Sequence, residues 1–176
     1  MKICIYGSAN EDIDIAYRNA GEQLGEAMAK AGHTLIFGGG ANGMMGAVAR
    51  GMRRFGGKII GISPEFFNVD GVLFESCSEM IYTADMRSRK EKLEDMADAF
   101  IVTPGGIGTM DEFFETLSLK QLGIIKKPLV LFNVNGFYDN LITLLKTSAD
   151  RSFIGKEDIL LFSAASGIDE LMENFK

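Results

Sequence analysis

The chain has 176 residues, is 47% hydrophobic and carries a formal net charge of -6 at pH 7. This length fits one domain with a sizeable core, and the acidic charge argues against a nucleic-acid partner, because phosphate neutralisation needs a basic stripe. One histidine, two cysteines and the lack of an apolar run of about 18 residues argue against a metal site and a membrane-spanning helix, and favour a reducing cytoplasm.

Strand-like and helical runs alternate along the whole chain, a pattern typical of a parallel sheet covered by helices on both faces. In chain order, hydrophobic periodicity predicts strand 3–6, helix 20–31, strand 34–37, helix 43–55, strands 58–63 and 80–83, helix 85–97, strand 99–103, helix 109–122, strand 128–133 and helices 138–149 and 168–174. We therefore expect residues 1–176 to form one α/β domain with a doubly wound, Rossmann-like sheet. The irregular segment 64–78 is expected to be the most mobile loop.

Three glycine-containing loops each follow a predicted strand: 7–8, 38–43 and 105–109. In open parallel sheets, ligands bind beyond the carboxyl ends of the strands, so the fold would bring these loops to one edge. The first strand is not followed by G-x-G-x-x-G, the second does not end in an acid, and no Gly-Lys-Ser/Thr is present, so neither a dinucleotide site nor a P-loop is expected. Gly39, Gly40 and Gly43 would let the backbone approach a nucleotide, or the loop is only a flexible turn with Gly46 packing on the sheet.

The third loop has the sequence Pro-Gly-Gly-Ile-Gly-Thr-Met-Asp-Glu over residues 104–112, at the junction of a strand and a helix. Glycines at such a junction turn backbone N–H groups toward an anion, so a phosphorylated small molecule is the expected ligand. Thr109 and Glu112 also fit a capping box, in which the threonine caps the helix and the glutamate reaches back, and both interpretations stay open.

An inward-facing arginine supplies the second feature of the site. Arg89 lies three residues after Met86 and four before Leu93, on the apolar face of its predicted helix, so its charge needs an anion. Glu112 would be that anion, because a carboxylate beside a phosphate site is costly without a cationic partner or a chemical role. Lys90 is more simply a solvated charge, although it lies near enough to the helix start to reach a substrate.

Residues 86–90 (Met-Arg-Ser-Arg-Lys) and 104–112 together resemble the LOG family, the cytokinin riboside 5'-monophosphate phosphoribohydrolases. The resemblance extends through 7–8, 38–46 and 121–128 and covers most of the chain. It implies hydrolysis of the N-glycosidic bond of AMP or N6-isopentenyl-AMP, without a cofactor or metal, by Arg89 and Glu112 as the catalytic pair. The residues implied or expected to bind substrate or phosphate are Ser8, Gly39, Gly40, Gly43, Met86, Lys90, Gly105, Gly106, Gly108 and Thr109.

The resemblance also implies a homodimer, for which Phe113, Phe114 and Leu117 offer an apolar face that would equally suit a buried core. Arg87 stands where many members have histidine, and Ile107 where many have an aromatic or polar residue, which leaves base preference open. Members are often labelled lysine decarboxylases, but no pattern here suggests a pyridoxal phosphate site. The alternative is a non-catalytic nucleotide or molybdenum-cofactor carrier protein, which would gain little from a carboxylate beside the phosphate.

Overall fold

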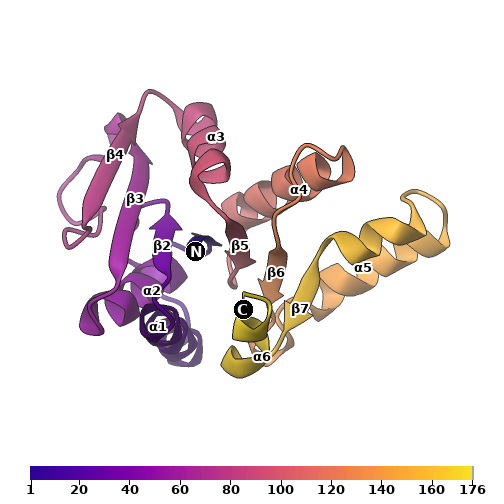
Figure 1. The fold of residues 1–176 in the computed structure, drawn as a ribbon, viewed down its shortest axis with the longest axis horizontal. Helices are drawn as coiled ribbons and strands as arrows, with labels where there is room; N and C mark the ends of the chain where they lie inside the picture. Colours follow the sequence, from indigo (N-terminus) through magenta and orange to yellow (C-terminus); the bar gives the residue numbers. More distant parts are fainter. Residues whose placement is uncertain (176) are drawn as a thin grey trace.

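The computed structural model describes residues 1–175, and its centre is a sheet of seven parallel strands. The strands are β1 (Lys2–Tyr6), β2 (Thr34–Phe37), β3 (Lys58–Pro64), β4 (Glu79–Thr83), β5 (Ala99–Val102), β6 (Leu129–Phe132) and β7 (Ser163–Ala165). Their order across the sheet is β4-β3-β2-β1-β5-β6-β7 (Figure 1). The predicted doubly wound, Rossmann-like α/β fold is confirmed.

Helices connect the strands and cover both faces of the sheet. The α-helices described in residues 1–175 are α1 (Ile15–Lys30), α2 (Gly43–Arg54), α3 (Met86–Met96), α4 (Ile107–Gln121), α5 (Asp139–Asp150) and α6 (Ile168–Glu173). The 3-10 helices are η1 (Glu65–Phe67), η2 (Val134–Gly136) and η3 (Lys156–Leu161). None of these helices is long and apolar enough to cross a lipid bilayer.

Alternating side chains of the strands divide the core into two layers. In β1, Ile3 and Ile5 point into a layer with α1, α2 and α6, whereas Cys4 and Tyr6 point into a layer with α3, α4 and α5 (Figure 1). This follows from the two-residue period of a strand, and it explains why β1, β2, β5 and β6 are apolar on both faces.

The strand order reverses between β1 and β5, which lie side by side at the middle of the sheet. Strands β2, β3 and β4 lie in that order on one side of β1, and β5 lies on its other side. At such a switch point the loops after the two central strands diverge to opposite faces and leave a crevice. The loops after β1 and β5 still touch at their start, since Ser8 N–H donates to the Pro104 carbonyl at 3.2 Å.

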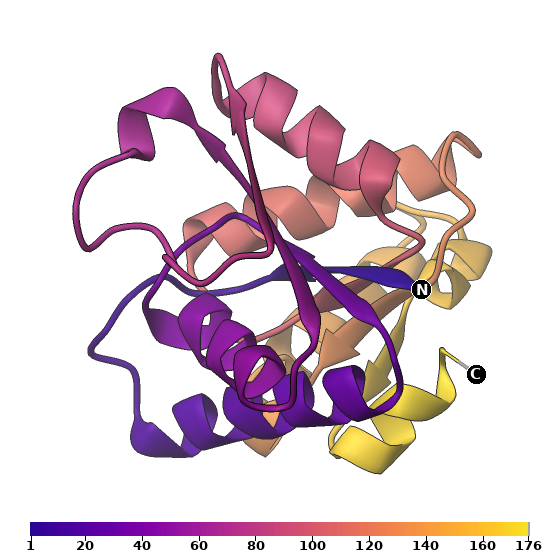
Figure 2. The same cartoon turned by 60° about the vertical axis from the view of Figure 1, so that its left-hand side comes forward.

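Two local features differ from the sequence prediction. Strand β7 was missed because its three residues, Ser163–Ala165, are short and only one is buried. Helix α4 begins at Ile107 and α1 at Ile15, earlier than expected. Segment 64–78, whose mobility stays a prediction, contains η1 and pairs with the loop after β2 through a β-bridge between Gly40 and Leu73 (Figure 2).

Candidate active site

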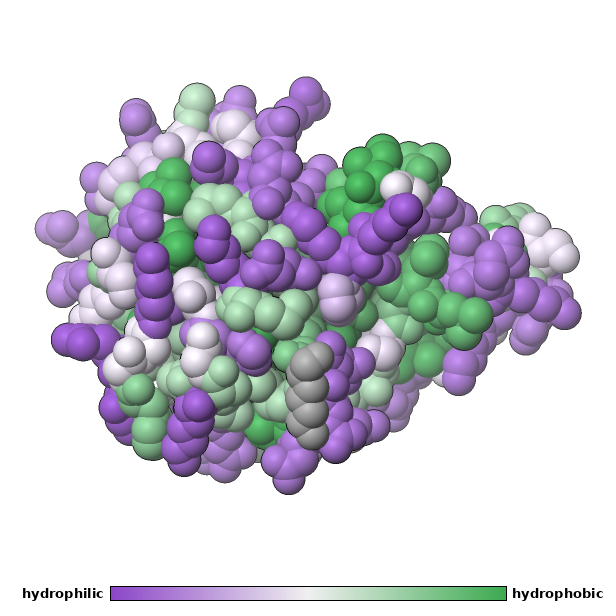
Figure 3. All heavy atoms as spheres, in the orientation of Figure 1, coloured by the Kyte–Doolittle hydropathy of each residue, from purple (hydrophilic) through white to green (hydrophobic). Residues whose placement is uncertain are grey.

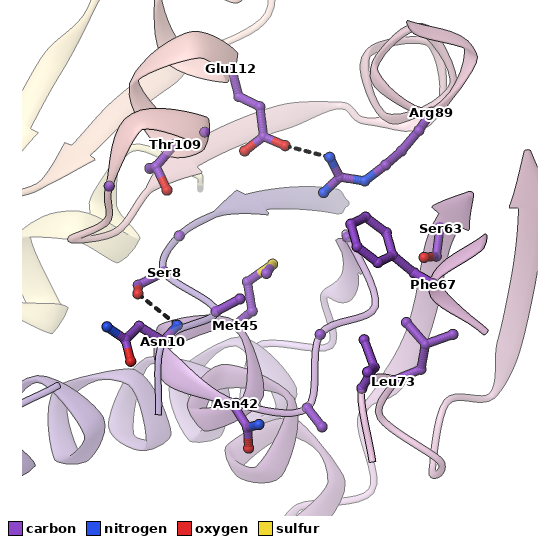
Figure 4. A pocket seen from close by; sticks show the side chains of 18 of the residues that line it. Ser8, Asn10, Asn42, Met45, Ser63, Phe67, Leu73, Arg89, Thr109 and Glu112 are labelled. Atoms are coloured by element: carbon purple, nitrogen blue, oxygen red, sulfur yellow. Dashed lines mark hydrogen bonds and ion pairs between the residues drawn. The ribbon is translucent and has the colours of Figure 1, made fainter. Parts of the chain in front are cut away.

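A cavity of about 640 Å³ opens at the carboxyl edge of the sheet, beside the switch point. Its lining comes from the loops after β1, β2, β3 and β5 and from the first turns of α3 and α4 (Figure 4). The lining residues are Gly7, Ser8, Ala9, Asn10, Gly38, Gly40, Ala41, Asn42, Met45, Ser63, Phe67, Gly71, Val72, Leu73, Met86, Arg89, Gly106, Gly108, Thr109 and Glu112. The predicted convergence of the three glycine loops at one edge is therefore present.

Helix α4 points an uncapped N-terminus at this cavity. Gly106 is its N-cap residue and no side chain accepts a hydrogen bond there, so the N–H groups of the first turn have no intrahelical or side-chain acceptor. A Cβ at Gly106 or Gly108 would meet no protein atom within 4 Å, so packing does not demand glycine at either position. The bare N-terminus therefore offers donors and a partial positive charge to an anion in the cavity.

The capping-box interpretation of Thr109 and Glu112 is wrong. Because α4 begins at Ile107, Thr109 is the third residue inside the helix rather than its cap. Thr109 is buried, and its hydroxyl turns toward the cavity beside the loop after β1 (Figure 4). Thr109 and Glu112 are three residues apart on α4 and both line the cavity, as residues at that spacing on one helix face must.

The loop after β1 is held against both α2 and the loop after β5. Met45 N–H donates to the Ser8 carbonyl at 3.1 Å, and Asn10 N–H donates to Ser8 Oγ at 3.0 Å. Gly43 has a φ of 61°, and a Cβ there would overlap the Ser8 carbonyl. Gly43 thus supports the site by allowing this close approach, and it does not line the cavity itself.

A buried ion pair joins α3 to α4 at the cavity wall. Arg89 Nη1 donates to Glu112 Oε1 at 2.9 Å, and each side chain is only 9% exposed (Figure 4). Arg89 Nε also donates to the Ile62 carbonyl at 3.3 Å. A Cβ at Gly38 would overlap the Arg89 guanidinium, so the glycine loop after β2 makes room for this side chain. The predicted partnership of Arg89 with a carboxylate is present.

Different parts of the surroundings of Glu112 shift its pKa in opposite directions. Burial raises the pKa of Glu112 above its ordinary value, while the charge of Arg89 and its hydrogen bond lower it. Arg89 occupies Oε1, and no residue among 1–175 donates a hydrogen bond to Oε2. The second oxygen of Glu112 is therefore available to a ligand or a water in the cavity.

The backbone just before α4 is fixed by a buried hydroxyl network. The Tyr138 hydroxyl donates to the Thr103 carbonyl at 2.7 Å, and Thr103 Oγ1 donates to the Tyr6 carbonyl at 2.9 Å. All three residues are buried. These bonds lock the ends of β1 and β5 together and so set where the α4 N-terminus points.

Not every predicted site residue lines the cavity. Ser8, Gly40, Met86, Arg89, Gly106, Gly108, Thr109 and Glu112 line it. Gly39 and Gly105 lie in the adjoining loops and Gly43 is the first residue of α2, and none of the three lines the cavity. Lys90 faces elsewhere, where its Nζ forms ion pairs with Asp111 and Glu115 of α4, so its position does not support contact with substrate.

Sequence reasoning missed the cavity wall that follows β3. Phe67, Val72 and Leu73 line this side, and Asn10 and Met45 were also not singled out. The run Glu-Phe-Phe directly after a buried strand could have predicted this wall, because two adjacent aromatic residues in an irregular segment indicate a surface that another group covers. Among the described residues, no group of three or more His, Cys, Asp or Glu side chains is arranged to hold a metal ion.

Comparison with known proteins gives a full-length match. The model of the family described as "Possible lysine decarboxylase" matches residues 45–175. The chain is 32% identical to the cytokinin riboside 5'-monophosphate phosphoribohydrolase LOG7 of Arabidopsis thaliana, over 99% of this chain and 81% of that protein. It is 33% identical to the cytokinin riboside 5'-monophosphate phosphoribohydrolase LOG of Oryza sativa subsp. japonica, over 97% of this chain and 71% of that one.

Solved structures with the same fold include proteins that bind a cofactor. The molybdenum cofactor binding protein of Rippkaea orientalis superposes with a TM-score of 0.74 at 22% identity, covering 98% of this chain and 93% of that one. The Moco carrier protein of Chlamydomonas reinhardtii superposes with a TM-score of 0.72 at 21% identity, covering 98% and 93%. At these identities the likeness concerns the fold alone.

Proposed function

The chain belongs to the LOG family, and we propose that it hydrolyses the N-glycosidic bond of a nucleoside 5'-monophosphate, giving a free base and ribose 5-phosphate. The observation that supports this most directly is the buried Arg89–Glu112 pair, which lies in the cavity beside the uncapped N-terminus of α4. An anion site and a charged carboxylate in one cavity fit a phosphorylated substrate that develops positive charge as it reacts.

In the proposed reaction, the bond between C1' of the ribose and the base nitrogen breaks, and its electron pair leaves with the base. Positive charge then develops on the ribose ring, and the Glu112 carboxylate stabilises it. Water supplies a hydroxyl to C1' and a proton to the departing base. The free Oε2 of Glu112 is placed to orient that water, while Arg89 holds Oε1 and favours the ionised form of the buried carboxylate.

The 5'-phosphate would bind at the N-terminus of α4. The N–H groups after Gly106 and the Thr109 hydroxyl provide donors, and the loop carrying Ser8 faces them across the cavity. Anchoring the phosphate there places the ribose, the next group along the substrate, near Glu112. AMP and N6-isopentenyl-AMP are the first candidates, in keeping with the named activity of the relatives in Arabidopsis and rice.

A carrier of a phosphorylated pterin would use the same anion donors. In a carrier, however, burying the Glu112 carboxylate would cost free energy, and the charge would have no role. The Arg89–Glu112 pair therefore favours hydrolysis over carriage.

The first prediction is that Glu112→Gln loses about a hundredfold or more in turnover, because the amide cannot stabilise positive charge on the ribose. The purified protein is incubated with AMP and with N6-isopentenyl-AMP, and free base and ribose 5-phosphate are measured by chromatography. Glu115→Gln is the matched control, because it makes the same chemical change one turn along α4, outside the cavity lining.

Base release that disappears in Glu112→Gln and persists in Glu115→Gln supports the mechanism. Base release at the wild-type rate by Glu112→Gln contradicts it. If the folded wild-type protein binds both nucleotides and releases no base from either, the carrier function is favoured instead.

A further inference from the structure

We propose that the segment after β3 binds the substrate's nucleobase, with the ring of Phe67 as its stacking surface, so that this segment selects the base. The inference rests on the proposed function. It assigns a binding surface to the nucleobase, the part of the substrate that neither the Arg89–Glu112 pair nor the α4 N-terminus would bind. The two ends of the cavity differ in chemistry (Figure 4).

One end of the cavity is polar, and the other is apolar except for Ser63, whose hydroxyl donates to the Pro64 carbonyl at 3.4 Å (Figure 4). Ser8, Asn10 and Thr109 gather at the first end, beside the N-terminus of α4 (Figure 4). Phe67 and Leu73 stand at the other end, and Val72 also lines the cavity. We call Phe67, Val72 and Leu73 the apolar wall. A phosphate binds at the first end, and a flat, weakly polar ring is the group that an apolar surface of this kind accepts.

The Arg89–Glu112 pair lies between the two ends. In Figure 4 the Glu112 carboxylate faces Arg89, and the Phe67 ring lies next to the Arg89 guanidinium, on the opposite side of Glu112 from Thr109. The sequence of groups across the cavity is therefore anion donors, carboxylate, aromatic ring. A nucleoside 5'-monophosphate presents phosphate, ribose and base in the same sequence, so the base reaches the apolar wall when the phosphate sits on α4.

Phe67 is exposed enough to be used by a ligand. Its side chain is 43% exposed although it lines a cavity, and Val72 beside it is 40% exposed. Aromatic rings left open to water at a pocket are apolar surface that a planar ligand can cover. Every nucleobase has a face that stacks on an aromatic ring, and loss of such a ring weakens nucleotide binding by roughly tenfold or more.

Backbone hydrogen bonds fix the Val72 and Leu73 part of the apolar wall to the rest of the site. Ala41 N–H donates to the Val72 carbonyl at 3.0 Å, and Phe74 N–H donates to the Gly39 carbonyl at 2.8 Å. These bonds flank the β-bridge between Gly40 and Leu73. The segment is thus attached to the glycine loop after β2, and a base would meet a surface that already has its shape.

The chain provides a matched control for Phe67. Phe66 is its neighbour in η1, the two ring centroids are 4.6 Å apart, and Phe66 is 59% exposed but does not line the cavity. Phe66→Ala removes the same group from the same turn, outside the cavity lining, and takes away the ring that packs against Phe67. Any general loosening of η1 therefore appears in both variants, whereas loss of stacking appears only in Phe67→Ala.

The test measures binding by titration calorimetry in the Glu112→Gln background, where AMP is not consumed. The ligands are AMP and ribose 5-phosphate, which share the phosphate and the sugar and differ in the base. We expect Phe67→Ala to weaken AMP binding by roughly tenfold or more while ribose 5-phosphate binds as before. Phe66→Ala should leave both unchanged, and Phe67→Trp should restore AMP binding.

Equal AMP affinity in Phe67→Ala and Phe66→Ala would overturn the assignment of the base to Phe67, as would a matching loss of ribose 5-phosphate affinity. These outcomes are independent of the hydrolysis assay. The two proposals can also fail separately. If Phe67→Ala weakens AMP binding selectively but the wild-type protein releases no base, the assignment of the base to Phe67 stands and only the proposed reaction is contradicted.

Discussion

Arg89 opposes the effect of burial on the pKa of Glu112. A carboxyl group buried in a cavity wall would favour its neutral form, and the guanidinium at 2.9 Å opposes this. The pair is costly to bury, and removing one partner leaves the other charge uncompensated. Substitution of Arg89 therefore acts on the chemistry through Glu112 as well as on substrate contacts.

The second prediction concerns the pH dependence of Arg89→Ala. Without the Arg89 cation, burial and the charge of Asp111 raise the pKa of Glu112 and only Lys90 lowers it, so this pKa rises further above the ordinary value. If the ionised carboxylate is the active form, turnover falls, and the acidic limb of the profile of kcat/KM against pH moves to higher pH. Arg87→Ala, an exposed arginine in the same helical turn, is the control and should leave the limb in place. An unmoved limb in Arg89→Ala would mean that Glu112 is not the titrating group.

At the scale of elements, the two helices of the catalytic pair begin in opposite ways. Helix α3 has a complete capping box, in which Ser88 N–H donates to Asp85 Oδ1 at 2.8 Å and Asp85 N–H donates to Ser88 Oγ at 3.2 Å. Helix α4 has no side-chain cap. Arg89 follows Ser88 directly, so the cap of α3 holds the arginine in position, while the bare end of α4 keeps its donors for a ligand.

The third prediction follows from the α3 cap. Asp85→Ala should lower Tm by about 2–4 °C and also reduce turnover, because fraying of the first turn loosens Arg89. Asp14→Ala is the matched control, since Asp14 caps α1 by accepting from Ala16 N–H and α1 lines no part of the cavity. It should lower Tm by a similar amount without changing kcat. Equal kcat in the two variants would show that the α3 cap does not position Arg89.

At the scale of the whole molecule, apolar side chains gather on the surface around the end of α4 and between α4 and α5 (Figure 3). A groove there is lined by Phe114 and Leu117 of α4 together with Phe162. Exposed apolar residues of these elements and their connections include Phe114, Leu122, Ile124, Leu144, Phe153 and Leu160. Phe113, which the sequence offered for an interface, is instead fully buried in the core. A surface of this kind favours association, and we propose a homodimer.

The fourth prediction is that the protein has the mass of two chains by light scattering, and that Leu160→Glu shifts it toward one. Leu160 is 84% exposed in η3, so a charge there costs the fold little and disrupts an apolar interface. Ile15→Glu is the control, because Ile15 is an exposed apolar residue on α1, on the other face of the sheet. A wild-type mass of one chain would contradict the proposal.

The sequence predicted the parts of the fold that local patterns encode. Apolar runs predicted β1 to β6, because buried parallel strands are apolar on both faces, and helical periodicity predicted the helices between them. The position of Arg89 on the apolar face of its helix required an anionic partner, and Glu112 is that partner. Strand β7 has three small residues and therefore no such pattern. It forms because its backbone pairs with β6.

The sequence by itself therefore determined the fold class, the placement of three glycine loops at one edge of the sheet and the residues of the ion pair. Only the tertiary structure decided that Gly106 rather than Thr109 is the N-cap of α4, that Lys90 is held by Asp111 and Glu115, and that Phe67 faces the cavity. The physical reason is that periodicity and glycine act over a few neighbouring residues. Caps, ion pairs and cavity walls depend on competition among partners that only the folded chain brings together.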